Sequence, residues 1–173
     1  MDWYKTVFDT IDMRSFSNLW FWVALAVLWS SASYWVLGVP FDMVTRARRN
    51  GGTAAEDLDT MVHINARRML FIARVSGLWL TGIAAFFFTT LAALGFLYHI
   101  EFAQAIFLLL APMTVVGGLS LRTSARIEAT GDRGPDLWRR LTRHRMRVQF
   151  VGALAIFVTA MWGMLKNLNV SVL

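Results

Sequence analysis

The chain contains no cysteine and has little charge for its length of 173 residues. Without a thiol it forms no disulfide, binds no metal through thiolate and carries no cysteine nucleophile. Charged residues make up 16% of the chain, whereas a soluble domain has about 25%. Hydrophobic residues make up 57%, above the usual ~45–50%. This surplus of apolar side chains predicts that lipid, rather than water, surrounds much of the protein.

A cleavable secretory signal and the common catalytic motifs are also absent. The first 18 residues contain three aspartates, one lysine and one arginine, which is not the basic start of a signal peptide. We therefore expect the first apolar run to remain as an anchor. The chain has no Walker sequence, no HExxH motif and no nucleophile elbow, and we predict that it is not an enzyme.

Four apolar stretches are long enough to cross the hydrocarbon core of a bilayer, which takes about 20 residues. Arg74 is the only charged residue in any of them. Because backbone amides in lipid must be satisfied within their own segment, each stretch is predicted to be a helix. The four predicted spans are 19–39, 69–98, 102–121 and 148–165.

These spans predict an all-α integral membrane protein of one domain, 1–173, with two helical hairpins, 19–98 and 102–165. Thirteen of the 17 lysines and arginines lie in two connections, 40–68 and 122–147. The positive-inside rule places both connections in the cytoplasm and both termini outside. Basic residues there meet anionic headgroups, and this explains the positive charge better than binding to nucleic acid.

Both basic connections are predicted to continue as helices beyond the membrane. The glycine pair in 50–52 ends the run that follows Pro40, and Gly131 ends the next such run. New helices are expected to start at Thr53 and near Pro135. Pro40 itself is expected to kink the first helix.

Three further features of the sequence predict contacts of the helices with the membrane, with a partner or with one another. Residues 1–17 are predicted to form an amphipathic segment on the periplasmic interface, with its apolar side chains on one helical face. Trp29 and Trp79 lie deeper, where they pack between helices, face lipid or meet a partner protein. Small residues are expected to allow close helix packing, and they include Gly77, Gly82, Gly117, Gly118 and Gly152.

Arginines are the main candidates for functional contacts. Arg74 lies seven residues after Arg67, so the two share a helical face. Arg74 either binds an anion, a lipid phosphate or a partner carboxylate, or extends to the cytoplasmic headgroups. A denser cluster precedes the last span. The candidate contacts for anions, lipids or partners are Arg67, Arg74, Arg139, Arg140, Arg143 and Arg147.

No cofactor and no metal are predicted. His99 and Glu101, at the outer turn, are too few for a metal site without a third ligand. A bis-histidine haem requires His63 and His144 to face one cavity within the bundle. Both are instead expected outside the bundle, in the cytoplasm beside arginines.

The N-terminal quarter, "MDWYKTVFDTIDMRSFSNLWFWVALAVLWSSASYWVLGVPFDMVTRA", resembles a family of small uncharacterised inner-membrane proteins from alphaproteobacteria. Members of this family often carry the label "component of SufBCD complex", which refers to iron–sulfur assembly. The resemblance implies a location in the bacterial inner (cytoplasmic) membrane. It implies no activity and assigns no catalytic residue.

The sequence therefore favours a non-enzymatic accessory, stabilising or assembly subunit of a larger membrane complex, because little polar functionality points into the bundle. The expected partners are anionic phospholipids and either other integral membrane proteins or further copies of the chain. The alternative is an oligomeric anion channel or small transporter, in which Arg67 and Arg74 form basic rings.

Overall fold

The computed structural model describes residues 15–170, of which 91% are helical. Three helices are long and apolar enough to cross a membrane, and a fourth apolar helix is shorter. The predicted helical class is therefore confirmed, while residues 1–14 of the predicted amphipathic segment lie outside the described residues. The elements are η1 (Ser15–Ser17), α2 (Leu19–Tyr34), β1 (Trp35–Val36), β2 (Val39–Pro40), α3 (Phe41–Asn50), α4 (Gly52–Ala92), the π-helical turn η2 (Ala93–Leu97), α5 (Glu101–Thr130) and α6 (Gly134–Val170).

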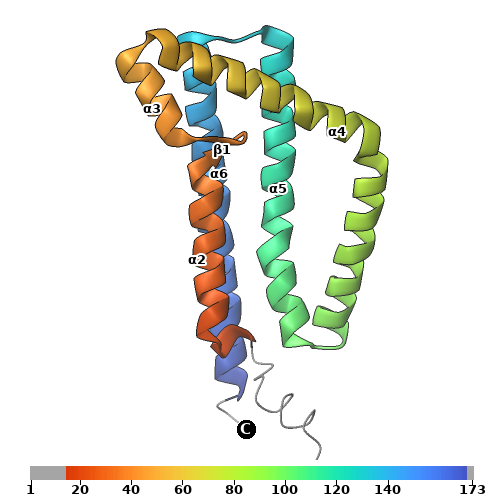
Figure 1. The fold of residues 1–173 in the computed structure, drawn as a ribbon. Coiled ribbons are helices and arrows are strands. Elements are labelled where there is room, and N and C mark those ends of the chain that lie inside the picture. Colours follow the sequence, from red (N-terminus) through yellow and green to blue (C-terminus); the bar gives the residue numbers. More distant parts are fainter. Residues whose placement is uncertain (1–14, 171–173) are drawn as a thin grey trace, which may run out of the picture.

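The helices form an elongated bundle (Figure 1). α2 and α5 both pack against α6, while the C-terminal part of α4 runs along the bundle beside α5. The N-terminal part of α4 lies across the ends of α5 and α6 instead, together with α3 and the β1–β2 hairpin. This end of the molecule contains residues 35–68 and 122–147, and we call it the arginine-rich end.

The best-buried hydrophobic core lies at the arginine-rich end. Leu58 and Val62 of α4 are fully buried against Ile127 of α5 and against Leu137 and Leu141 of α6. Residues four apart share a helical face, so both side chains enter the same cluster. Side chains of α3 and of the hairpin complete the cluster. The basic connections are thus a folded layer with a core of its own.

The first apolar run is not one helix as far as Val39, which corrects the sequence prediction. α2 ends at Tyr34, and the two short strands that follow pair with each other. Leu37 and Gly38 form the tip of this hairpin with φ of 50° and 76°, the positive values that a two-residue hairpin turn requires. Val36, Leu37 and Val39 are buried in the core of the arginine-rich end, so protein and not lipid covers them.

The expected kink at Pro40 is also wrong. Pro40 has φ of −67° and ψ of 140° and immediately precedes the first residue of α3. A proline costs no hydrogen bond there, because the first N–H groups of a helix have no partner within the helix. The glycine stops are confirmed, since α3 ends before Gly51 and α5 before Gly131, both with positive φ.

Trp29 gives α2 and α6 a very close contact. Its side chain is 4% exposed, and a Cβ added to Gly152 would lie 2.6 Å from its Cε3 atom. The expected packing at small residues is therefore confirmed at Gly152. It is not found at four other glycines, where an added Cβ meets no atom within 4 Å: Gly77, Gly82, Gly117 and Gly118.

This contrast predicts opposite effects for two glycine substitutions. Gly152→Ala is expected to destabilise the protein by about 1–3 kcal/mol, because the indole must move away from the new methyl group. Gly118→Ala fills open space in a helix and is expected to be neutral or to stabilise by up to about 1 kcal/mol. Thermal unfolding in mild detergent, followed by circular dichroism, measures both. Equal midpoints for the two variants would contradict the close contact.

Candidate functional site

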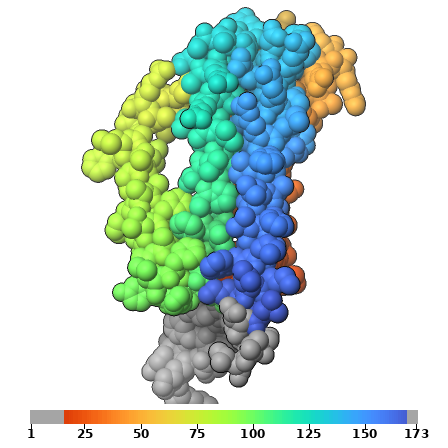
Figure 2. Space-filling model, turned by 180° about the vertical axis from the view of Figure 1, so that it is seen from behind, coloured from red at the N-terminus to blue at the C-terminus, as the bar shows by residue number. Residues whose placement is uncertain are grey.

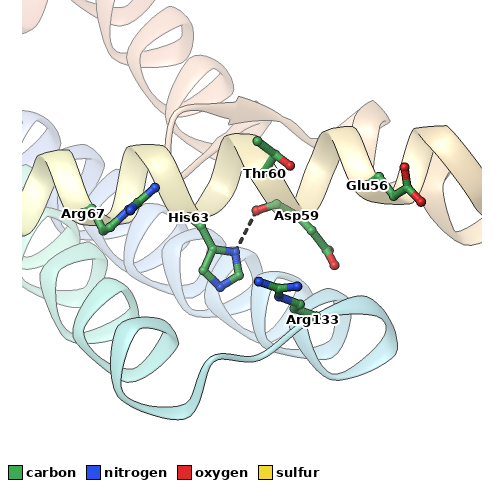
Figure 3. A pocket seen from close by; sticks show the side chains of 6 residues that line it. All are labelled: Glu56, Asp59, Thr60, His63, Arg67 and Arg133. Atoms are coloured by element: carbon green, nitrogen blue, oxygen red, sulfur yellow. Dashed lines mark hydrogen bonds between the residues drawn. The ribbon is translucent and has the colours of Figure 1, made fainter.

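A polar pocket opens at the arginine-rich end, between α4 and the connection from α5 to α6 (Figure 3). Its volume is about 280 Å³. Five of its residues recur on α4 at intervals that place them along one side of the helix, and one comes from the connection. The lining residues are Glu56, Asp59, Thr60, His63, Arg67 and Arg133. Arg67 is the one predicted candidate among them.

Asp59 joins the two walls of this pocket. Its carboxylate accepts a hydrogen bond from the backbone N–H of Gly134, with Oδ2 at 3.0 Å. Gly134 is the first residue of α6, where the helix dipole favours a negative charge. His63 Nδ1 lies 2.7 Å from the backbone oxygen of Asp59. A carbonyl only accepts, so Nδ1 donates and Nε2 is the ring atom available to a ligand.

The charged side chains of the pocket are held apart from one another. No ion pair within 4 Å involves Glu56, Asp59, Arg67 or Arg133 in the part of the chain that the structure describes. Glu56 and Arg67 are separated by eleven residues, or roughly 16 Å along a helix. The pocket therefore has an acidic end and a basic end, with Arg133 facing the middle of the row (Figure 3).

Arg140 has a structural role. Its Nε donates to Asp132 in the connection from α5 to α6, and the two side chains are 26% and 13% exposed. Hydrogen bonding to Arg140 lowers the pKa of Asp132 below its usual value. The neighbouring Arg139 lies 3.6 Å from Asp136, but these side chains are 72% and 76% exposed. The sequence places both arginines in one run and does not distinguish them.

The remaining arginine candidates differ in their partners. Arg74 Nη2 lies 2.8 Å from Glu128 Oε2, which joins α4 to α5. The predicted intramembrane arginine thus has a carboxylate partner within the chain, although both side chains also reach solvent. Arg143 and Arg147 are exposed and form no ion pair with any described residue. Their contact with lipid or with a partner stays a prediction.

His144 corrects the expectation that both histidines lie outside the bundle. It is buried on the same face of α6 as Leu137 and Leu141. Its Nδ1 lies 3.1 Å from Thr123 Oγ1, and its Nε2 lies 3.4 Å from the hydroxyl of Ser120. The ring is therefore held by α5, away from the pocket that contains His63. Within residues 15–170 no group of three or more His, Asp or Glu is arranged to hold a metal ion.

Gln104 is a polar contact that sequence reasoning missed. It is fully buried near the start of α5. Its Nε2 donates to the backbone oxygen of Gly95 at 2.6 Å, and its Oε1 accepts from Trp162 Nε1 at 3.0 Å. One side chain thus ties η2, α5 and α6 together at the end opposite the arginines. The available signal was a single amide in an apolar run, since such groups bond across helices in lipid.

Arg145 is a second residue that the sequence does not single out. Its Nε donates to the backbone oxygen of Ser33 at 3.1 Å. Its guanidinium carbon also lies 4.0 Å from the centre of the Phe41 ring, a favourable cation–π distance. Arg145 therefore joins α6 to the end of α2 and to the start of α3.

The apolar segment of α4 packs on the rest of the protein mainly near its ends. Only 11% of its most apolar stretch is buried, against 28% in α6. Met69 contacts Ser124 at one end, and Phe88 packs on Phe107 at the other. Figure 2 shows an opening between α4 and α5 over the part that lies between these contacts. Large side chains there are exposed, with values of 87% for Leu78, 76% for Trp79 and 76% for Phe86.

The fold defines a nearly all-helical chain with apolar helices long enough for a membrane. No family model, curated protein or solved structure matches it. Two features of this chain bear on its function, the arginine-rich end and the exposed apolar segment of α4.

Removing Arg140 is expected to loosen the connection from α5 to α6. Arg140→Gln leaves the mostly buried Asp132 carboxylate without its charged donor. It is expected to lower the free energy of unfolding by roughly 1–3 kcal/mol. Arg139→Gln, the matched control, removes an exposed pair and is expected to cost less than about 0.5 kcal/mol. Chemical denaturation in detergent measures the two losses, and hydrogen exchange at 131–141 locates them.

The difference in stability between wild type and Arg140→Gln is expected to depend on pH, because the pKa of Asp132 is lowered. A carboxyl group with a lowered pKa stabilises the folded state at any pH above its pKa in the unfolded chain, which is near 3.8. This stabilisation disappears as the pH falls through the lower pKa of the folded state. The gap between wild type and Arg140→Gln is therefore expected to persist at neutral pH and to shrink in acid below that range. A gap that is unchanged at low pH would show that the ion pair is not its cause.

Proposed function

We propose that the protein crosses the bacterial inner membrane four times, with the arginine-rich end in the cytoplasm. Three long apolar helices and the concentration of arginines at one end support this arrangement. α2 is the short member, since its 16 residues rise about 24 Å against a core of roughly 30 Å. Exposed Trp20 and Trp35 flank it, and interfacial tryptophans anchor helix ends in a bilayer.

The lack of cysteine makes this topology directly testable. Arg48→Cys at the arginine-rich end is expected to resist a membrane-impermeant maleimide in intact cells and to react after lysis. Tyr98→Cys, at the opposite end and exposed, is expected to react in both cases. Gel shifts report the labelling, and reaction of Arg48→Cys in intact cells would contradict the orientation.

Within this membrane we propose a non-enzymatic role as an accessory, stabilising or assembly subunit of a larger complex. The observation that carries the proposal is the exposure of the apolar segment of α4. Transmembrane helices associate by close packing, which small residues permit. Gly77 and Gly82 offer such close approach, and no described residue occupies the space beside them. A helix of another integral membrane protein fits this segment.

The second candidate, an oligomeric anion channel, has no comparable support. Its basic rings would be formed by Arg67 and Arg74. Arg74 is paired with Glu128, so each copy would bring a carboxylate to the ring beside the guanidinium. The charge that selects an anion would then be largely compensated. We therefore keep the accessory subunit as the proposed function.

Site-specific cross-linking tests the α4 contact. A photoreactive residue in place of Trp79 is expected to give a discrete adduct with another polypeptide in native membranes. Phe157, exposed on α6, is the matched control position. Trp79→Ala is expected to lower recovery of the partner in mild detergent by up to roughly 30-fold, the effect of losing one interface hot spot. A monodisperse protein without any second polypeptide, and no adduct at Trp79, would overturn the proposal.

A further inference from the structure

We infer that the pocket in Figure 3 binds a small zwitterion that carries a phosphate group and a primary ammonium group. Ethanolamine phosphate has this chemistry, both as a free compound and as the headgroup of phosphatidylethanolamine. The volume of about 280 Å³ lies just below the usual range of ligand pockets, about 300–1,000 Å³. It therefore suits a headgroup-sized ligand.

The basic end of the pocket suits the phosphate. Arg67 of α4 lies at this end and Arg133 of the opposite wall faces the middle of the row, and neither has an ion-pair partner among the described residues. Guanidinium groups bind phosphate through paired, charge-assisted hydrogen bonds. His63 lies between them along the row (Figure 3), with Nδ1 held by the Asp59 backbone oxygen. A phosphate has three acceptor oxygens, enough to engage both arginines.

The acidic end explains why a simple anion does not suffice. Glu56 and Asp59 line the same cavity, and their carboxylates repel a ligand that carries only negative charge. Asp59 already accepts from the backbone of Gly134, but an ionised carboxylate has four acceptor sites and keeps capacity for an ammonium group. A ligand with both signs of charge is therefore favoured over either ion alone.

The position of the pocket favours a lipid as the source of the headgroup. Arg67 stands two residues before the predicted span that begins at Met69. In the proposed topology, on which this step rests, its guanidinium lies at the level of the phospholipid phosphates. From there the row of pocket residues extends along the surface segment of α4 to Glu56 (Figure 3). The free compound shares this chemistry, and the experiment separates the two sources.

Lipid retention by the full-length protein tests the inference. The protein is placed in nanodiscs with equal amounts of phosphatidylethanolamine and phosphatidylglycerol, extracted in mild detergent and examined by native mass spectrometry. We expect phosphatidylethanolamine to be retained over phosphatidylglycerol by roughly tenfold, the effect of one charged hydrogen bond. Isothermal titration with soluble ethanolamine phosphate then tests the headgroup alone, with glycine as a zwitterion that lacks phosphate.

Two variants separate the ends of the ligand. Glu56→Gln removes one of the two carboxylates that face the ammonium group and is expected to remove most of the preference while phosphatidylglycerol is still retained. Arg133→Gln removes a phosphate partner and is expected to lower retention of both lipids by about tenfold. Both side chains are exposed, so the fold is expected to persist, which circular dichroism checks. Asp57→Asn and Arg139→Gln change the same charges outside the pocket and are expected to leave the preference for phosphatidylethanolamine over phosphatidylglycerol unchanged.

Each outcome decides the matter. Retention of phosphatidylethanolamine with loss of preference in Glu56→Gln supports the site, and binding of the soluble compound shows whether the headgroup alone suffices. Equal retention of the two lipids, equal effects in the control variants, or glycine binding as tightly as ethanolamine phosphate would each overturn it. None of these results depends on whether α4 binds a partner protein.

Discussion

The packing of the N-terminal part of α4 across the ends of α5 and α6 positions the core of the arginine-rich end and the polar pocket. Leu58 and Val62 pack on the ends of those two helices. There they are buried from water in one cluster with Ile127, Leu137 and Leu141. Apolar burial of this kind is strongly favourable where water is the solvent. With this segment fixed, Asp59 lies against the first residue of α6. The same placement forms both walls of the polar pocket.

The proposed membrane location explains the uneven packing of the molecule, because water and lipid then surround different parts of it. At the arginine-rich end water drives apolar side chains into a compact core. Along the apolar helices lipid tails are as apolar as leucine, so helices join only where shape or a hydrogen bond favours contact. Close fit in shape joins Trp29 to Gly152, and a hydrogen bond joins Gln104 to Trp162. The middle of the apolar segment of α4 has no comparable contact, and Figure 2 shows an opening there between α4 and α5.

The sequence was sufficient for the helical class and for the glycine ends of α3 and α5. These features depend on local spacing and on backbone conformation, which neighbouring residues determine. The end of α2 was not predictable in this way. Val36 and Val39 are as apolar as the residues before them, and composition does not reveal whether lipid or a protein core covers a side chain. The separate fates of Arg139 and Arg140 likewise depend on where the fold places Asp132.

The opening between α4 and α5 has a mechanical consequence. α4 is attached near both ends of its apolar segment, through Arg74 and Glu128 on one side and through Phe88 and Phe107 on the other. Its middle lies beside the opening between α4 and α5. In the proposed membrane location acyl chains fill this opening, so the separation of the two helices there is expected to vary with lipid composition, while the buried core of the arginine-rich end keeps its arrangement.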